Sequence, residues 1–141
     1  MPRKVVLVLL ILSGVSFTST AQDDNDGSLI KKSIFFGGGS YYIDEGQIEE
    51  LREFIEGIEN IQNYEVNIFS HTDPIGGKEY NEWLSTKRSE AVYLELLEIS
   101  VPSNIIKIRD FGFSNALYTN YSSGGRRMNR RVDVILWPIV F

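Results

Sequence analysis

The pattern of apolar and polar positions predicts two amphipathic helices in this chain. The apolar residues of the first helix recur at helical spacing and are Ile48, Leu51, Ile55 and Ile58. Asp44, with Gln47 three residues later, is typical of a helix N-terminus, and residues 60–63 are expected to end this helix. The second helix is predicted over residues 78–98, because that segment closes shortly before Pro102.

Four short segments have the pattern of β-strands. They are residues 33–36, 65–70, 105–111 and 131–137. The last of them alternates, so that Val132, Val134 and Leu136 are expected to point inward. A polar loop rich in Asn, Ser and Gly is predicted over residues 114–125. The order β-α-β-α-β-β predicts an α+β sandwich, in which two main helices pack on one mixed four-stranded sheet.

The N-terminus has the features of a secretory signal peptide. Arg3 and Lys4 precede an apolar run over residues 5–15, and small residues stand before Gln22. We therefore expect residues 1–21 to be a signal peptide, 22–32 a flexible leader and 33–141 the folded domain. A retained membrane anchor is the alternative, although the apolar run is shorter than the ~20 residues that span a bilayer. The chain has no cysteine, so we expect neither a disulfide nor a lipid anchor.

The charge of the chain argues against nucleic acid as a partner. The sequence carries 14 basic and 19 acidic residues, a formal net charge of −5. Two of the basic residues and none of the acidic ones lie in residues 1–21, so the remaining chain has 12 against 19, net −7. A phosphate-binding surface requires a basic stripe. The late arginines are Arg126, Arg127, Arg130 and Arg131, and we expect them to pair with carboxylates rather than form a phosphate patch.

A line of polar residues on the second helix indicates a binding site. Asn81, Ser85 and Arg88 are spaced i, i+4, i+7 beside the apolar stripe that should face the core. Asp73 lies just after the second strand. A small ligand that carries both an ammonium and a carboxylate would suit such a pair, because a carboxylate holds the ammonium and Arg presents a fork to the ligand carboxylate. A structural ion pair between Asp73 and Arg88 is the alternative.

The sequence lacks the residues of a metal site, a hydrolase active site or a phosphate-binding loop. His71 is the single histidine and cannot form a metal site alone, so we expect it to support a loop by hydrogen bonding. Ser70 and Ser85 have no partners at the spacing of a hydrolase triad. Gly76-Gly77-Lys78 is followed by Glu79 instead of the Ser or Thr of a phosphate loop. We therefore predict neither an enzyme nor a bound metal or cofactor.

These motifs together resemble the OmpA-like peptidoglycan-binding domain, over most of the chain after residue 33. The resemblance is carried by His71-Thr72-Asp73, Gly76, Tyr80-Asn81, Leu84-Ser85, Arg88, Val92, Leu96 and Asn129-Arg130-Arg131-Val132. In that family the matching aspartate and arginine hold the diaminopimelate of the peptide stem, which implies this task for Asp73 and Arg88. The chain departs from the family at Ser89, usually Ala, and at residues 37–39, where three glycines replace a loop bearing Asp or Asn.

The resemblance implies a periplasmic protein that binds peptidoglycan without covalent attachment and is held near the outer membrane by the cell wall. The predicted ligand-binding residues are Asp73, Arg88, Asn81, Thr72, Gly39 and Arg131. Arg131 is expected to close the pocket in a mainly structural capacity, while Arg130 points outward. The alternative function is an envelope interaction protein of the same fold, with a degenerate pocket and an acidic first helix that docks a protein partner.

Overall fold

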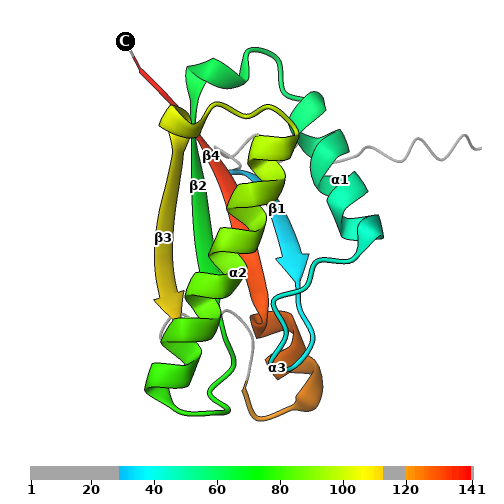
Figure 1. The fold of residues 1–141 in the computed structure, drawn as a ribbon, viewed down its shortest axis with the longest axis vertical. Coiled ribbons are helices and arrows are strands. Elements are labelled where there is room, and N and C mark those ends of the chain that lie inside the picture. The colour runs from blue at the N-terminus through cyan, green and yellow to red at the C-terminus, as the bar shows by residue number, and fades with distance from the viewer. Residues whose placement is uncertain (1–28, 113–119, 141) are drawn as a thin grey trace, which may run out of the picture.

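The computed structural model of this protein describes residues 29–112 and 120–140 (Figure 1). The strands in these ranges are β1 (Ile30–Phe35), β2 (Tyr64–His71), β3 (Ile106–Gly112) and β4 (Arg131–Pro138). The helices are α1 (Glu45–Glu56), α2 (Lys78–Glu98) and α3 (Ser123–Asn129), with short 3-10 turns η1 (Ile61–Asn63) and η2 (Ser103–Ile105). None of these helices is both long and apolar enough to cross a membrane.

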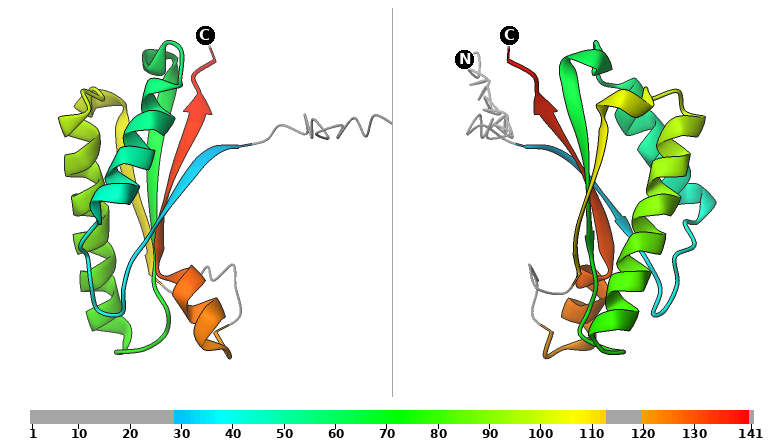
Figure 2. Two further views of the ribbon diagram at one scale, coloured as in Figure 1. Left: turned by 90° about the vertical axis from the view of Figure 1, so that its right-hand side faces the viewer. Right: turned by 60° about the vertical axis from the view of Figure 1, so that its left-hand side comes forward.

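The four strands form one mixed sheet in the order β1-β4-β2-β3. β4 runs antiparallel to both of its neighbours, and β2 and β3 are parallel. β1, β2 and β3 therefore end at the same edge, where β4 begins. Figure 2 shows α1 and α2 together on one face of the sheet, and α3 at the edge where β4 begins. The loops that follow β1 and β2 both lie at this edge, where residues of each line one pocket.

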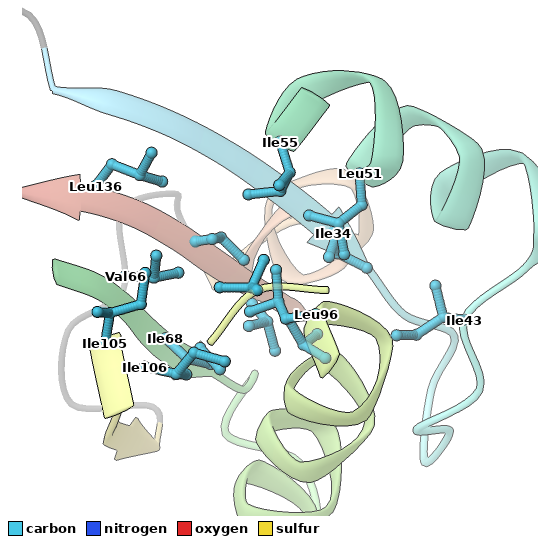
Figure 3. Packing of buried hydrophobic residues seen from close by; sticks show 14 of the residues in the cluster. Ile34, Ile43, Leu51, Ile55, Val66, Ile68, Leu96, Ile105, Ile106 and Leu136 are labelled. Carbon is cyan, nitrogen blue, oxygen red and sulfur yellow. The ribbon is translucent and has the colours of Figure 1, made fainter. Parts of the chain in front are cut away.

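The hydrophobic core lies between the sheet and the two long helices (Figure 3). The sheet contributes Ile34, Val66, Ile68, Val132, Val134 and Leu136, all of which are buried. The helices contribute Leu51, Ile55, Val92 and Leu96, also buried. The predicted inward alternation on the last strand is confirmed, because side chains two residues apart point to the same face of a strand. The predicted fold of two main helices on a mixed four-stranded sheet is also confirmed.

The predicted start of α1 is confirmed by its cap. The Asp44 carboxylate accepts a hydrogen bond from the Gln47 backbone N–H at 3.1 Å and another from its side-chain amide at 2.6 Å. The same Gln47 amide accepts from the Phe35 N–H at 2.7 Å and donates to the Phe35 carbonyl at 2.9 Å. The Gln47 side chain therefore holds the capping carboxylate of Asp44 and also satisfies the backbone groups of Phe35 at the outer edge of β1, which would otherwise be unpaired.

The structure corrects several element boundaries. β1 begins at Ile30 instead of residue 33, so its first residues lie in the segment predicted to be a flexible leader. α1 ends at Glu56, before the residues predicted to end it. α3 occupies part of the segment predicted as a polar loop; it lacks apolar periodicity and is capped by Ser122, which accepts from the Gly125 N–H at 3.0 Å. The predicted signal peptide and residues 114–119 of the predicted loop lie outside the described residues.

α2 ends as predicted before Pro102, with a residue in the left-handed region of backbone space. Ser100 has φ of 68°. Its N–H donates to the Leu97 carbonyl at 3.0 Å, and the Val101 N–H donates to the Leu96 carbonyl at 3.0 Å. This pair of bonds is the Schellman arrangement, in which the left-handed position is usually glycine. Val101 and Leu96 are both buried, which supplies the apolar contact that accompanies the motif.

Replacing Ser100 with glycine is expected to raise the free energy of unfolding by about 1 kcal/mol, because glycine adopts positive φ without the steric cost of a Cβ. Urea denaturation of the two proteins measures this difference. Ser103→Gly is the matched control, since Ser103 lies in η2 outside the left-handed region. A variant Ser100→Gly that is no more stable than the wild type would contradict the assigned backbone conformation.

Candidate ligand-binding site

A pocket opens at the edge of the sheet where β1 and β2 end, with a volume of about 200 Å³, which is room for one amino-acid-sized group. Its walls come from the loop after β1, the loop after β2, the first half of α2, and the residue before β4. The lining residues are Gly38, Gly39, Thr72, Asp73, Ile75, Gly76, Tyr80, Asn81, Leu84, Arg88 and Arg130. The pocket therefore has two cationic side chains and one carboxylate in its wall.

Arg88 is fully buried in the floor of this site. Its Nε donates to the Ser40 carbonyl at 2.8 Å, and its Nη2 donates to the Gly37 carbonyl at 3.0 Å. The guanidinium also lies 5.1 Å from the centre of the Phe36 ring, within the range of a cation–π contact. Within the described residues, Nη1 has no hydrogen-bond partner although it is buried. The loop after β1 thus fixes the guanidinium while leaving one of its donors unused.

The charge of Arg88 persists at neutral pH despite its burial. Burial first, and the nearby charge of Arg130 second, lower the pKa of Arg88 to about 10, against the opposing carboxylate of Asp73. A group with this pKa is cationic at pH 7. The guanidinium therefore presents a full positive charge to the pocket in surroundings that screen it weakly, and an anion that reached it would be held strongly.

Asp73 lies across the same pocket and is held from two sides. Its Oδ1 accepts from the Ile75 N–H at 3.0 Å, and its Oδ2 accepts from Nη1 of Arg130 at 2.9 Å. Arg130 is itself anchored, because its Nε donates to the Phe36 carbonyl at 3.2 Å and its carbonyl accepts from the Phe36 N–H at 2.9 Å. A carboxylate has about four acceptor positions, so Asp73 keeps capacity for a further donor.

Two more buried polar groups of the pocket are unsatisfied within the described part of the chain. They are the Thr72 hydroxyl and the Asn81 amide nitrogen, on residues that are each 1% exposed. A buried polar atom without a hydrogen bond costs about 1–3 kcal/mol. Three such atoms, with Nη1 of Arg88, belong to the wall of one small pocket. Three polar atoms that are unpaired within the described residues, all in the wall of one pocket, indicate that these groups are placed to bind a ligand and not to hydrogen-bond to one another.

Tyr80 is positioned by two glycines with positive φ. Gly39 has φ of +65° and Gly76 has φ of +102°, a conformation that other residues rarely adopt. A Cβ on Gly39 would lie 3.0 Å from the Tyr80 hydroxyl, and one on Gly76 would lie 2.4 Å from its ring. Both loops can therefore close on Tyr80 only because these positions lack side chains. The run of glycines after β1 also contacts Arg88, because the Gly37 carbonyl accepts a hydrogen bond from its Nη2.

The structure brings together most of the residues predicted from the sequence. Asp73, Arg88, Asn81, Thr72 and Gly39 all line the pocket. The polar line on α2 is buried, with Asn81, Ser85 and Arg88 each at most 1% exposed.

The predicted positions of the two arginines before and at the start of β4 are wrong. Arg130 was expected to point outward, yet it lines the pocket and pairs with Asp73, whereas Arg131 is absent from the pocket wall. Strand alternation offered the signal: Arg130 is two residues before Val132, so the two share a face, and Val132 points to the core.

Arg131 belongs to a separate polar cluster on the opposite face of the sheet. Its Nε lies 3.2 Å and 3.1 Å from the two carboxylate oxygens of Asp133. Asp133 also accepts from the Ser33 hydroxyl at 2.6 Å, and its Oδ2 lies 3.3 Å from Nε2 of His71. His71, the last residue of β2, therefore hydrogen-bonds to β4; its predicted hydrogen-bonding role is confirmed, but it joins two strands instead of supporting a loop. Within residues 29–112 and 120–140, no group of three or more His, Cys, Asp or Glu side chains is arranged to hold a metal.

Residues 35–130 match the model of the OmpA family. The chain belongs to the OmpA family. The predicted family resemblance is thereby confirmed, and the match runs from the last residue of β1 to the residue after α3, including all the residues that line the pocket.

This OmpA-family chain is similar to envelope proteins of several bacteria. It is 27% identical over 107 residues to the outer-membrane lipoprotein YfiB of Pseudomonas aeruginosa, covering 76% of this chain and 64% of YfiB. It is 25% identical over 122 residues to the peptidoglycan-associated lipoprotein of Buchnera aphidicola, covering 84% of this chain and 70% of that protein. The chain thus spans less than two thirds of YfiB. The crystal structure of the peptidoglycan-associated lipoprotein from Burkholderia pseudomallei has the same fold, with a TM-score of 0.70 at 24% identity over 75% of this chain and 90% of that one.

Arg130 and Arg131 provide a test of the two polar clusters. Arg131→Ala is expected to lower the free energy of unfolding by about 3 kcal/mol, because it leaves the buried Asp133 carboxylate without its cation. Arg130→Ala is expected to cost less, because the side chain of Arg130 is 18% exposed and water can reach Asp73 through the pocket. Urea denaturation of both variants measures the difference. An equal loss of unfolding free energy in the two variants would contradict this expectation, because it would show that the Arg131–Asp133 pair stabilises the fold no more than the Arg130–Asp73 pair.

The stability of the protein is expected to fall in acid partly through Asp133. Burial opposes ionisation of this carboxyl, but hydrogen bonds from His71 and Ser33 and the charge of Arg131 keep its pKa below the ordinary value. Its contribution is therefore complete above the unfolded pKa of about 3.9 and is lost as the pH falls through the lower folded pKa. Denaturation between pH 6 and pH 2.5 should show a steeper loss for the wild type than for Asp133→Asn. Parallel profiles would contradict this linkage.

Proposed function

We propose that the protein binds peptidoglycan non-covalently by holding the diaminopimelate of a peptide stem in the pocket between Asp73 and Arg88. The observation that carries this proposal is the buried guanidinium of Arg88, which is cationic and has one donor without a partner among the described residues. A permanent buried charge with an unused donor beside an open pocket is stabilised when an anion binds.

The charges of the pocket suit a ligand with both an ammonium and a carboxylate. Arg88 and Arg130 supply two positive groups, and Asp73 supplies one negative group that retains acceptor capacity. The free end of diaminopimelate carries an amino group and a carboxylate on one carbon. In the proposed complex the carboxylate lies against Arg88, with Arg130 beside it, and the ammonium donates to Asp73. The Thr72 hydroxyl and the Asn81 amide then satisfy the remaining polar atoms of the ligand.

The family supports this assignment. The two relatives named peptidoglycan-associated lipoprotein share the fold or the sequence of this chain, and YfiB is named as an outer-membrane protein. We accordingly propose that the protein acts as a binding module of the periplasm and not as an enzyme. Because the sequence has no cysteine, we propose that the cell wall, rather than a lipid, holds it near the outer membrane.

A comparison of two stem peptides tests the chemistry of the ligand. Lysine differs from diaminopimelate by lacking the carboxylate that Arg88 would bind. Isothermal titration of the purified protein should therefore give an affinity for the diaminopimelate peptide that is about 1.5–3 kcal/mol greater than for the lysine peptide, the value of a hydrogen bond to a charged group. Equal affinities would contradict the assigned orientation, and the absence of binding to either peptide or to purified sacculi would overturn the proposed function.

Substitutions in the pocket locate the binding site. Asp73→Ala and Arg88→Ala are each expected to cost roughly 2–5 kcal/mol of binding, because the opposite charge on the ligand is left unpaired. Arg88 also holds the loop after β1, so Thr72→Val serves as a variant that keeps volume and removes a hydroxyl without a described partner. Ser85→Ala is the matched control, because Ser85 is equally buried and unpaired among the described residues but lies outside the pocket wall.

The acidic face of α1 supports the alternative of a protein partner. Glu45, Glu49, Glu50, Glu53 and Glu56 are exposed along this helix. If sacculi and stem peptides both fail to bind while an envelope protein is captured, and if charge reversal on α1 abolishes that capture, the interaction module becomes the assigned function. The pocket variants distinguish peptidoglycan binding from docking of a protein partner, because they leave the α1 surface unchanged.

A further inference from the structure

Three half-exposed aromatic side chains form a surface beside the pocket. Tyr41, Tyr80 and Trp83 have exposed fractions of 47%, 42% and 47%. The ring centres of Tyr80 and Trp83 are 5.9 Å apart, and those of Tyr41 and Trp83 are 6.0 Å apart at an interplanar angle of 88°. We name these three residues the aromatic platform. They lie outside the hydrophobic core, and each keeps more than 40% of its surface exposed.

The platform is continuous with the pocket. Tyr80 belongs to both, because it lines the pocket and also contacts Trp83. Trp83 is three residues after Tyr80 on α2, which places the two side chains next to each other on the helix surface. Tyr41 directly follows Ser40, whose carbonyl accepts a hydrogen bond from Arg88. The elements that fix the buried guanidinium therefore also fix the exposed rings.

We propose that the aromatic platform binds the sugar rings of the glycan strand from which the peptide in the pocket extends. This inference rests on the proposed function. A pyranose ring presents a face of C–H groups, which packs against the face of an aromatic ring, and its hydroxyls at the edge stay in water. A few residues of extended peptide span ~10 Å, at about 3.5 Å per residue. A stem residue held in the pocket therefore brings its glycan within reach of rings that lie next to the pocket wall.

The charges around the platform favour a neutral saccharide over an anionic partner. Phenol and indole rings are uncharged at neutral pH. Glu79 and Glu82 are exposed on α2 near Tyr80, and Nζ of Lys78 lies 3.8 Å from Oε1 of Glu82. The charges beside Tyr80 therefore offer no excess of positive charge to an anionic lipid headgroup or another polyanion. N-acetylated sugar rings carry no charge, so they require no such excess. Exposed apolar surface bordered by polar residues is typical of a binding site in a soluble protein.

The test compares one peptide with and without its sugar. The probes are a soluble stem peptide that contains diaminopimelate and the same peptide carried on its N-acetylated disaccharide, titrated calorimetrically into the full chain. The wild type is expected to bind the disaccharide form about two- to tenfold more tightly, the range of one aromatic contact. Trp83→Ala should bring this ratio close to one and leave the affinity for the free peptide unchanged. Trp83→Phe should restore most of the ratio.

Leu94→Ala is the matched control, because Leu94 is 59% exposed and lies on the same side of α2, ~16 Å farther along the helix by its rise per residue. It should leave both affinities unchanged. If the wild type binds both probes equally, the inference is overturned while the proposed function stands. If it binds neither probe, both are overturned. If Trp83→Ala keeps the ratio but converts a dimer to a monomer in sedimentation, the platform is a contact between copies of this chain and the inference is overturned.

Discussion

The buried guanidinium of Arg88 is the constraint on which the arrangement of this end of the molecule depends. A charge can stay in a protein interior only when its hydrogen bonds and counter-charges offset the loss of water. Two backbone carbonyls from the loop after β1 accept from it, at Gly37 and Ser40, and the Phe36 ring lies against it. Because these partners are backbone atoms, the loop must follow the course that the arginine dictates.

That constraint extends to the start of β4. Phe36 exchanges backbone and side-chain hydrogen bonds with Arg130, and Arg130 reaches the Asp73 carboxylate after β2. The loop after β1, the loop after β2 and the residue before β4 are thus joined around one pocket. The site does not depend on any single flexible loop, which is the condition for holding charged groups at fixed separations.

Strand geometry divides the polar residues between two tasks. Arg130 and Arg131 are neighbours in the chain, yet one meets Asp73 in the pocket and the other meets Asp133 on the far face of the sheet. Side chains alternate between faces with a period of two, so adjacent identical residues enter different environments. On α2 the corresponding division is between Val92 and Leu96, which pack in the core, and the polar line of Asn81, Ser85 and Arg88 nearer the start of the helix.

The sequence by itself determined those features that depend on neighbours along the chain. The bounds of α2 and the cap formed by Asp44 and Gln47 follow from local spacing, and the family motif to which Asp73 and Arg88 both belong predicts their placement in one site. The tertiary structure alone decided which carboxylate each of the two neighbouring arginines meets, Asp73 for Arg130 and Asp133 for Arg131, and that α3 forms.

The tertiary structure also decided that the ring of Tyr41 contacts the ring of Trp83. The physical reason is that these outcomes depend on contacts between segments distant in sequence. Local propensity favours a helix or a strand over a few residues, whereas the partner of a side chain is fixed only when the sheet brings its strands and loops together.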